Sequence, residues 1–382
     1  MKIINFDNIL STGISNGIIT SINDASISII ELIARVEKKL SLDINNLYVL
    51  INNDTIFLKR QIETINIKNA KYITENDKND LMDKLYNESE ASLDNKLKVL
   101  EVIPIRYKVD DRSYVIDPLE MDGKMLDLEA DIVLASKSMI DDIYKTINKS
   151  SISISGISYF DVVIKDICIF REEKELGVLV LNISIDYTNI IIINKNNIVF
   201  SKRLNFGGNY LIKDIMYCLK VSYDVAKKII EENLNVNFES DNFVTYFDTN
   251  NDKKNITYTK IYEILEARLE EIFLLIKDKI LNEKENLFSY GIVLMGWVSN
   301  INFVKNFLEK IFGIKVRLSF IDDKKIKLAE NLLSIEDIRS NLVFLSALEY
   351  FYSKKEILNI FAKKAKGITI FSKMKKQLER IL

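Results

Sequence analysis

The residues best placed to do chemistry lie at 177–209, where short apolar runs surround a polar turn. This stretch reads GVLVLNISIDYTNIIIINKNNIVFSKRLNFGGN. We expect two strands joined by the turn Ser184–Tyr187, a third strand, and a Gly207-Gly208-Asn209 step that leads into a helix. Such a hairpin can hold a phosphate when turn glycines let backbone N–H groups approach its oxygens. This turn has no glycine, so it has the layout of a phosphate site without the usual donors.

The composition excludes several other kinds of catalytic centre. The chain has no histidine, which removes Ser-His and Cys-His nucleophile pairs and the HExxH zinc motif. Cys168 and Cys218 lie far apart without the spacing of metal ligands, so we expect two reduced packing thiols. Any catalysis would have to use carboxylates, lysines or a bound metal.

Length and charge restrict the class of protein further. The 382 residues are 48% hydrophobic, enough for several compact units of roughly 100–200 residues each. The net charge of −2 argues against a nucleic-acid partner. No apolar run approaches the roughly 18 residues of a membrane-spanning helix, and the N-terminus lacks the apolar core of a signal peptide.

Strands and helices alternate along the chain, which predicts an α/β architecture with more than one sheet. Apolar spacing predicts a helix with Asp24 as N-cap that continues to residue 40, and a capping-box helix over 74–89. A long amphipathic helix is predicted over 260–281. The other predicted helices are 138–150, 211–219, 223–234, 300–311 and much of 337–382. The predicted strands are 47–51, 97–109, 128–136, 177–183, 189–193, 198–204, 291–295 and 315–319, and the continuous apolar run 291–295 indicates a strand covered on both faces.

The last sixteen residues, GITIFSKMKKQLERIL, form an amphipathic pattern. Its apolar stripe consists of Ile368, Phe371, Met374, Leu378, Ile381 and Leu382, and its basic face consists of Lys373, Lys375, Lys376 and Arg380. This combination is typical of a helix that lies in a membrane interface, although a helix packed on its own domain gives the same pattern.

Several separate stretches resemble the FtsA family of bacterial actin-like proteins, in the family's order and spacing. These are the segments that begin at GISNGIITSIND, VIPIRYKVDDRSY, FSKRLNFGGNYL, ILEARLEEIF and GIVLMGWVSN. The segment around 103–123 resembles the insertion subdomain that marks the family. The resemblance implies an actin-like, ribonuclease H-like α/β fold of two lobes with an FtsA-type insertion.

The resemblance also implies how the chain is divided. We predict a first lobe core at 1–55 and 137–172, with the insertion subdomain at 56–136. The second lobe core takes 173–208 and 289–345, and its smaller subdomain takes 209–288. C-terminal helices fill 346–382 and include the membrane-targeting segment 367–382.

Actin-like proteins grip ATP with two phosphate hairpins and an adenosine loop, and each of these is altered in this chain. The resemblance to the family begins after the position of the first hairpin. Phe6-Asp7-Asn8 could not replace that hairpin, because it lacks the turn glycines. The degenerate cleft that corresponds to the second hairpin and the adenosine loop consists of Asn182, Ser184, Asp186, Thr188, Gly207, Gly208 and Gly296. Ile185 and Tyr187 add bulk, Asp186 adds negative charge, and Ile230 stands where the family has a basic residue. We therefore expect no bound cofactor and no hydrolysis, although the family's ligand, ATP with Mg²⁺, stays possible.

The leading interpretation is a non-enzymatic membrane adaptor of the division septum. The resemblance implies that it tethers the C-terminal tail of FtsZ, through 209–288, to an anionic membrane. It implies a location on the cytoplasmic face of the cell membrane at the division site, where the protein could also assemble into filaments. One alternative is a PilM-like adaptor, which would lack the C-terminal helix and bind a short peptide of a membrane partner. Others are an ATP-binding actin-like protein or a sugar kinase, which the missing glycines argue against.

Overall fold

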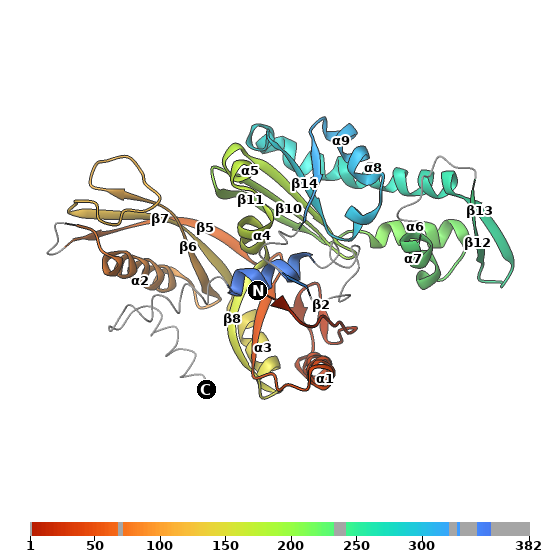
Figure 1. The fold of residues 1–382 in the computed structure, drawn as a ribbon, viewed down its shortest axis with the longest axis horizontal. Helices are drawn as coiled ribbons and strands as arrows, with labels where there is room; N and C mark the ends of the chain where they lie inside the picture. The colour runs from red at the N-terminus through yellow and green to blue at the C-terminus, as the bar shows by residue number, and fades with distance from the viewer. Residues whose placement is uncertain (1, 68–71, 233–241, 321–326, 329–341, 353–382) are drawn as a thin grey trace. The chain divides into compact units, whose positions relative to one another are not determined.

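The chain forms two compact units in a computed structural model that describes residues 2–67, 72–232, 242–320, 327–328 and 342–352 (Figure 1). The first unit holds the described residues of Ile3–Val163 and those from Ala347 onward, and the second holds Lys2 and the described residues of Ile164–Ser346. The finer division into five parts stays a prediction. The segment 367–382, with its predicted membrane-binding residues, lies outside the described residues.

The elements of the first unit alternate between helices and strands, as predicted. They are β2 (Ile14–Ser15), β3 (Ile18–Ile19), α1 (Ile22–Leu40), β4 (Asn46–Ile51), β5 (Phe57–Asn66), α2 (Glu75–Ser92), β6 (Leu97–Val109), β7 (Met125–Ser136), α3 (Lys137–Asn148) and β8 (Ser153–Tyr159). The two-residue strand β1 (Lys2–Ile3) precedes them, and α4 (Phe160–Cys168) leads into the second unit. Strands β4 and β8 pair in parallel, and α1 packs on α3.

Helix α1 begins earlier than predicted. Ser21 is its N-cap, since the Ser21 hydroxyl accepts the backbone N–H of Asp24 at 3.3 Å. The prediction of Asp24 as N-cap was therefore wrong. Asp24 lies instead in the first turn, where an acidic side chain also favours a helix start.

The insertion subdomain is a three-stranded antiparallel sheet in the order β5-β7-β6, covered on one face by α2 (Figure 1). Leu81 and Leu85 of α2 pack on Leu128 and Ile132 of β7 in a fully buried cluster. The predicted capping box of α2 is confirmed at Thr74 and Asp77. The sequence analysis did not predict β5, because charged residues interrupt its apolar pattern.

The second unit is built on a five-stranded sheet in the order β11-β10-β9-β14-β15. The predicted meander is confirmed as β9 (Val178–Ile183), β10 (Thr188–Asn194) and β11 (Asn197–Leu204), each antiparallel to the next. Strand β14 (Gly291–Met295) runs parallel to β9 and to β15 (Val316–Leu318). Every residue of β14 is buried, as the continuous apolar run predicts.

Helices contribute buried residues to the same hydrophobic core as this sheet. They are α6 (Asn209–Leu219), α7 (Tyr223–Glu232), α8 (Tyr258–Lys284) and α9 (Val304–Phe312). The long helix predicted over 260–281 is confirmed as α8, whereas the prediction at 300–311 began too early, because a 3₁₀ turn (Trp297–Asn300) comes first. Several elements were not predicted: the short strands β1, β2 and β3, β8, α4, α5 (Arg171–Leu176), the hairpin of β12 (Phe243–Phe247) with β13 (Lys253–Thr257), and β16 (Lys327–Leu328). Residues 342–352 are helical, as predicted.

Candidate functional site

The carboxyl ends of β9 and β14 meet at one edge of the second unit's sheet. Asn182 of β9 lies opposite Met295 of β14 in parallel register. The turn at Ser184 therefore begins beside Gly296, which follows β14. Ligands of open α/β sheets bind at this edge, beyond the carboxyl ends of the strands.

The structure brings all seven predicted cleft residues together at this edge. A Cβ atom added to Gly207 would lie 2.3 Å from the carbonyl oxygen of Ser184. A Cβ atom on Gly208 would lie 2.3 Å from the ring of Trp297. Gly296 has a φ of 85°, and its Cβ would lie 2.6 Å from Oδ1 of Asn182. These glycines allow chain segments to approach each other closely, which is a structural use.

Backbone hydrogen bonds fasten the turn to the start of α6. The N–H of Gly208 donates to the Ser184 carbonyl, and the N–H of Asn209 donates to the Ile185 carbonyl, both at 2.8 Å. The Thr188 hydroxyl donates to the Phe206 carbonyl at 2.8 Å. Free N–H groups at the start of a helix are the usual anion donors. Here two such donors are already used within the protein.

The local charge also disfavours a phosphate. The Asp186 carboxylate accepts a hydrogen bond from the Asn209 amide, whose oxygen accepts the Tyr223 hydroxyl. Burial raises the pKa of Tyr223, and the nearby carboxylates of Asp186, Asp224 and Glu231 raise it further. A cation also lies near this turn. The Arg203 guanidinium stacks on the ring of Tyr187, 4.6 Å from the ring centre. The residues of this edge therefore do not fit a triphosphate.

Asn182 is the most unusual polar group at this edge. Its side chain is only 2% exposed, and its Nδ2 has no hydrogen-bond partner. The resemblance implies a carboxylate here, which would suit Mg²⁺, whereas an amide is a weaker ligand for that ion. Over the described ranges, no three His, Cys, Asp or Glu side chains cluster closely enough to hold a metal ion.

Two residues at this edge were not singled out by the sequence analysis. Tyr223 bonds to Asn209, and Glu231 accepts the indole N–H of Trp297 at 3.1 Å. Both lie on α7, and nothing in their sequence spacing indicates that α7 returns to this edge. Ile230, at the position where the resemblance implies a basic residue, is 2% exposed and belongs to the core.

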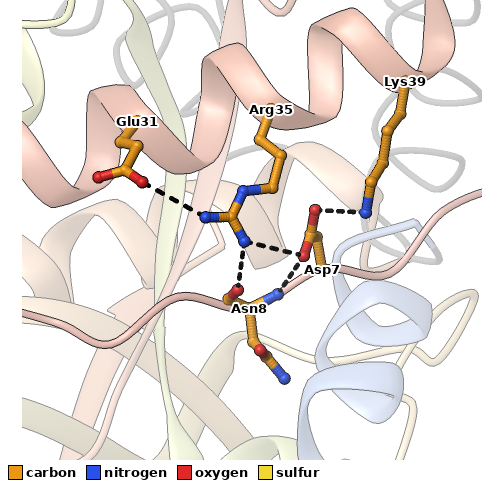
Figure 2. Close-up of polar contacts among 5 residues, drawn as sticks. All are labelled: Asp7, Asn8, Glu31, Arg35 and Lys39. Atoms are coloured by element: carbon orange, nitrogen blue, oxygen red, sulfur yellow. Dashed lines mark hydrogen bonds and ion pairs between the residues drawn. The ribbon is translucent and has the colours of Figure 1, made fainter.

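Asp7, the candidate for the first phosphate hairpin, is bound to α1 instead (Figure 2). Its carboxylate accepts a hydrogen bond from Lys39 at 2.7 Å and lies 3.7 Å from Arg35. Arg35 also donates to the Asn8 carbonyl and pairs with Glu31 (Figure 2). The hydrogen bond from Lys39 lowers the pKa of Asp7. This acid therefore holds the N-terminal segment against α1.

A second candidate site is a groove between α6 and α8. The hollow measures about 320 Å³ and is lined by Asp214, Tyr217, Cys218, Ile264, Ala267, Arg268 and Glu271. Asp214 holds Arg268 through two hydrogen bonds of 2.6 and 3.0 Å, and this contact raises the pKa of Arg268. Tyr217 is 72% exposed at the rim. Exposed tyrosine and ordered arginine side chains often dominate binding at protein interfaces.

Comparison with known proteins shows which family these features match. A family model described as the SHS2 domain inserted in FtsA matches residues 55–134, the sheet and helix of the insertion subdomain. The cell division protein FtsA of Buchnera aphidicola subsp. Baizongia pistaciae is 26% identical over 381 residues, covering 92% of this chain and 87% of the relative. The chain is similar to FtsA over most of its length. The FtsA of Bacillus subtilis is 22% identical over 325 residues, which cover 84% of this chain and 73% of the relative.

Solved structures show that the chain has an actin-like fold. A chain of the PilM-PilN type IV pilus biogenesis complex superposes with a TM-score of 0.59, covering 90% of this chain and 88% of the other at 12% identity. MreB5 of Spiroplasma citri bound to ADP gives a TM-score of 0.53, covering 91% of this chain and 80% of the other at 12% identity. At this identity the likeness concerns the fold alone. Among the described residues, no helix is long and apolar enough to cross a membrane.

Proposed function

We propose that this chain is a non-enzymatic adaptor of bacterial cell division that holds FtsZ filaments at the inner face of the cytoplasmic membrane. The observation that carries the proposal is the FtsA-type insertion subdomain, matched at residues 55–134 within an actin-like fold. FtsA relatives named cell division proteins match the chain over most of its length, which supports the same role.

The FtsZ tail would bind in the groove between α6 and α8. The exposed ring of Tyr217 provides an apolar contact surface beside Ile264 and Ala267. Arg268 keeps a fixed geometry because Asp214 and Glu271 both contact its guanidinium group. A preordered side chain loses less entropy when a peptide binds, and this favours a hot spot at Arg268.

The membrane contact would be made by residues 367–382, which lie outside the described residues. Each large apolar side chain of this segment that is buried in lipid would contribute ~1.5–3 kcal/mol. Each basic residue near anionic lipid would add ~1 kcal/mol.

Co-sedimentation with FtsZ filaments and anionic liposomes tests the proposal. We expect the full chain to bring FtsZ into the liposome pellet, and a chain ending at residue 366 to leave it in the supernatant. We expect Tyr217→Ala to weaken FtsZ binding about tenfold, since tyrosine hot spots cost more than 1 kcal/mol when truncated. Tyr290→Ala is the matched control, because Tyr290 is 48% exposed and does not line the groove. Equal liposome binding with and without residues 367–382 would refute the membrane role.

A further inference from the structure

The two edge strands of the insertion sheet are protected to very different degrees. Strand β6 carries Pro104, which has no N–H to offer, and its register shifts near Val99 and again near Pro104. Its outer edge is further occupied by a bridge in which Tyr107 and Val115 exchange hydrogen bonds of 2.7 and 2.8 Å. Proline, bulges and covering segments are the devices that keep a sheet edge from pairing with another chain.

Strand β5, at the opposite edge, lacks the proline and the bulges of β6. Its ten residues pair with β7 in unbroken register from Phe57 to Asn66, without proline or bulge. In the part of the chain that the structure describes, no strand pairs with the outer edge of β5. A long and regular edge of this kind is a template for an additional strand.

Thr64 shows which backbone groups of β5 point outward. Its N–H donates to the side chain of Glu63 at 3.0 Å, and its carbonyl accepts from Lys84 of α2 at 2.8 Å. The backbone N–H and carbonyl of Thr64 therefore point away from β7. Outward-pointing backbone groups alternate along a strand of an antiparallel pair, so those of Leu58, Arg60 and Ile62 point away from β7 as well. Side chains cover the edge at Thr64 and leave it open from Leu58 to Ile62.

The side chains of β5 are complementary to those of a second β5 strand. In an antiparallel pairing centred on Gln61, the exposed Lys59 lies opposite Glu63, and the exposed Phe57 lies opposite Ile65. Arg60 lies opposite Ile62, which is 54% exposed. No like charges meet, whereas a pairing centred on Arg60 would oppose two guanidinium groups. Opposite charges and aromatic–aliphatic pairs across strands stabilise such a sheet.

We propose that β5 pairs with β5 of a second copy of this chain about a two-fold axis at Gln61, so that the two insertion sheets become one. Arg60 and Ile62 of each copy exchange backbone hydrogen bonds with Ile62 and Arg60 of the other. Both α2 helices then cover the same face of the joined sheet, because Lys59, Gln61 and Glu63 all lie on the α2 face. The contact uses the same surface of both copies and closes at two, unlike a head-to-tail filament contact. It does not depend on the proposed function.

Disulfide trapping tests the register of the contact in the full chain. With Cys218→Ser removing the exposed native thiol, Gln61→Cys places two thiols directly opposite each other in a close, non-hydrogen-bonded pair. We expect Gln61→Cys to form a covalent dimer on mild oxidation. Ile62→Cys is the matched control, since its two thiols would be diagonal neighbours roughly 7–8 Å apart at their Cα atoms and would not cross-link. Cross-linking through residue 62 in place of 61, or through neither, would overturn the proposal.

Sedimentation velocity on the otherwise native chain provides an independent measurement. Ile62→Lys places a lysine opposite Arg60 of the other copy, twice in each dimer, while the exposed side chain leaves the monomer's core unchanged. We expect it to weaken dimerisation about tenfold or more, because like charges directly opposite each other destabilise a strand pair. Ile62→Thr, a strand-forming residue without charge, should retain the dimer. A monomeric parent chain, or equal association of the two variants, would contradict the two-fold contact.

Discussion

At the scale of single residues, the ion pairs of Asp7 make the stability of the folded chain depend on pH. Its carboxylate is held by Lys39 and Arg35 of α1 (Figure 2). A group whose pKa is lowered in the folded state stabilises that state at any pH above its unfolded value. The contribution is lost as pH falls through the folded pKa, which lies below the ordinary value of 3.8.

We therefore expect Asp7→Asn to lower the melting temperature at neutral pH, because the amide cannot pair with Lys39 as an ion. The difference in melting temperature between the variant and the parent chain should disappear as pH falls below 3.8, because the Asp7 carboxyl of the parent chain then becomes protonated. Thermal denaturation followed by circular dichroism at both pH values measures it. Asp111→Asn serves as the control, since no ion pair is found for Asp111 among the described residues. A difference that persists unchanged at acidic pH would show that the ion pair is not its cause.

At the scale of elements, the helix α2 depends on its first turn because its outer face is strongly polar. Only Leu81, Leu85 and Ser89 are buried along its eighteen residues. The helix start is stabilised reciprocally, since Asp77 accepts the Thr74 N–H at 2.8 Å and Thr74 accepts the Asp77 N–H at 3.3 Å. This capping box satisfies N–H groups that no helical carbonyl can reach.

We expect Thr74→Ala to reduce the free energy of unfolding of the insertion subdomain by about 1 kcal/mol, the usual cost of losing an N-cap side chain. Thr74→Ser keeps the hydroxyl and should retain most of that free energy. Urea denaturation followed at the insertion subdomain, through a single introduced fluorophore, gives the comparison. Equal losses for the two variants would indicate that the methyl group of Thr74, and not the cap, stabilises the helix.

At the scale of the whole molecule, the chain has an actin-like fold in which backbone hydrogen bonds join the turn at Ser184–Tyr187 to the start of α6. The N–H groups of Gly208 and Asn209 donate to the carbonyls of Ser184 and Ile185 and are therefore already used within the protein. Asp186 adds negative charge to the same turn. We propose that the protein performs its role without bound nucleotide.

We expect Mg-ATP at millimolar concentration to leave the melting temperature of the full chain unchanged. A ligand present at about 1,000 times its dissociation constant stabilises a protein by about 4.1 kcal/mol. Micromolar affinity would therefore raise the melting temperature by several degrees. An ATP-binding actin-like protein, measured in parallel, controls for the sensitivity of the assay. A clear upward shift in this chain would contradict the proposal.

Much of the fold could be predicted from local patterns, because apolar periodicity reports which face of an element is buried. The continuous run at Gly291–Met295, the meander from Val178 to Leu204 and the capping box of α2 were all predicted in this way and are observed. Strand β5 was missed because Lys59, Arg60 and Glu63 interrupt its apolar pattern. Tertiary contacts account for these charges, since Arg60 pairs with Asp131 of β7 and Glu63 pairs with Lys84 of α2.

By itself, the sequence determined the α/β architecture, the resemblance to FtsA and the glycine-free turn at Ser184–Tyr187. Those features depend on residue types and local spacing, which can be read directly along the chain. Only the tertiary structure decided that Gly207, Gly208 and Gly296 serve close packing and that Asp7 pairs with α1. It also decided that no strand among the described residues pairs with the outer edge of β5. Those features depend on which distant segments meet, and no local pattern specifies such contacts.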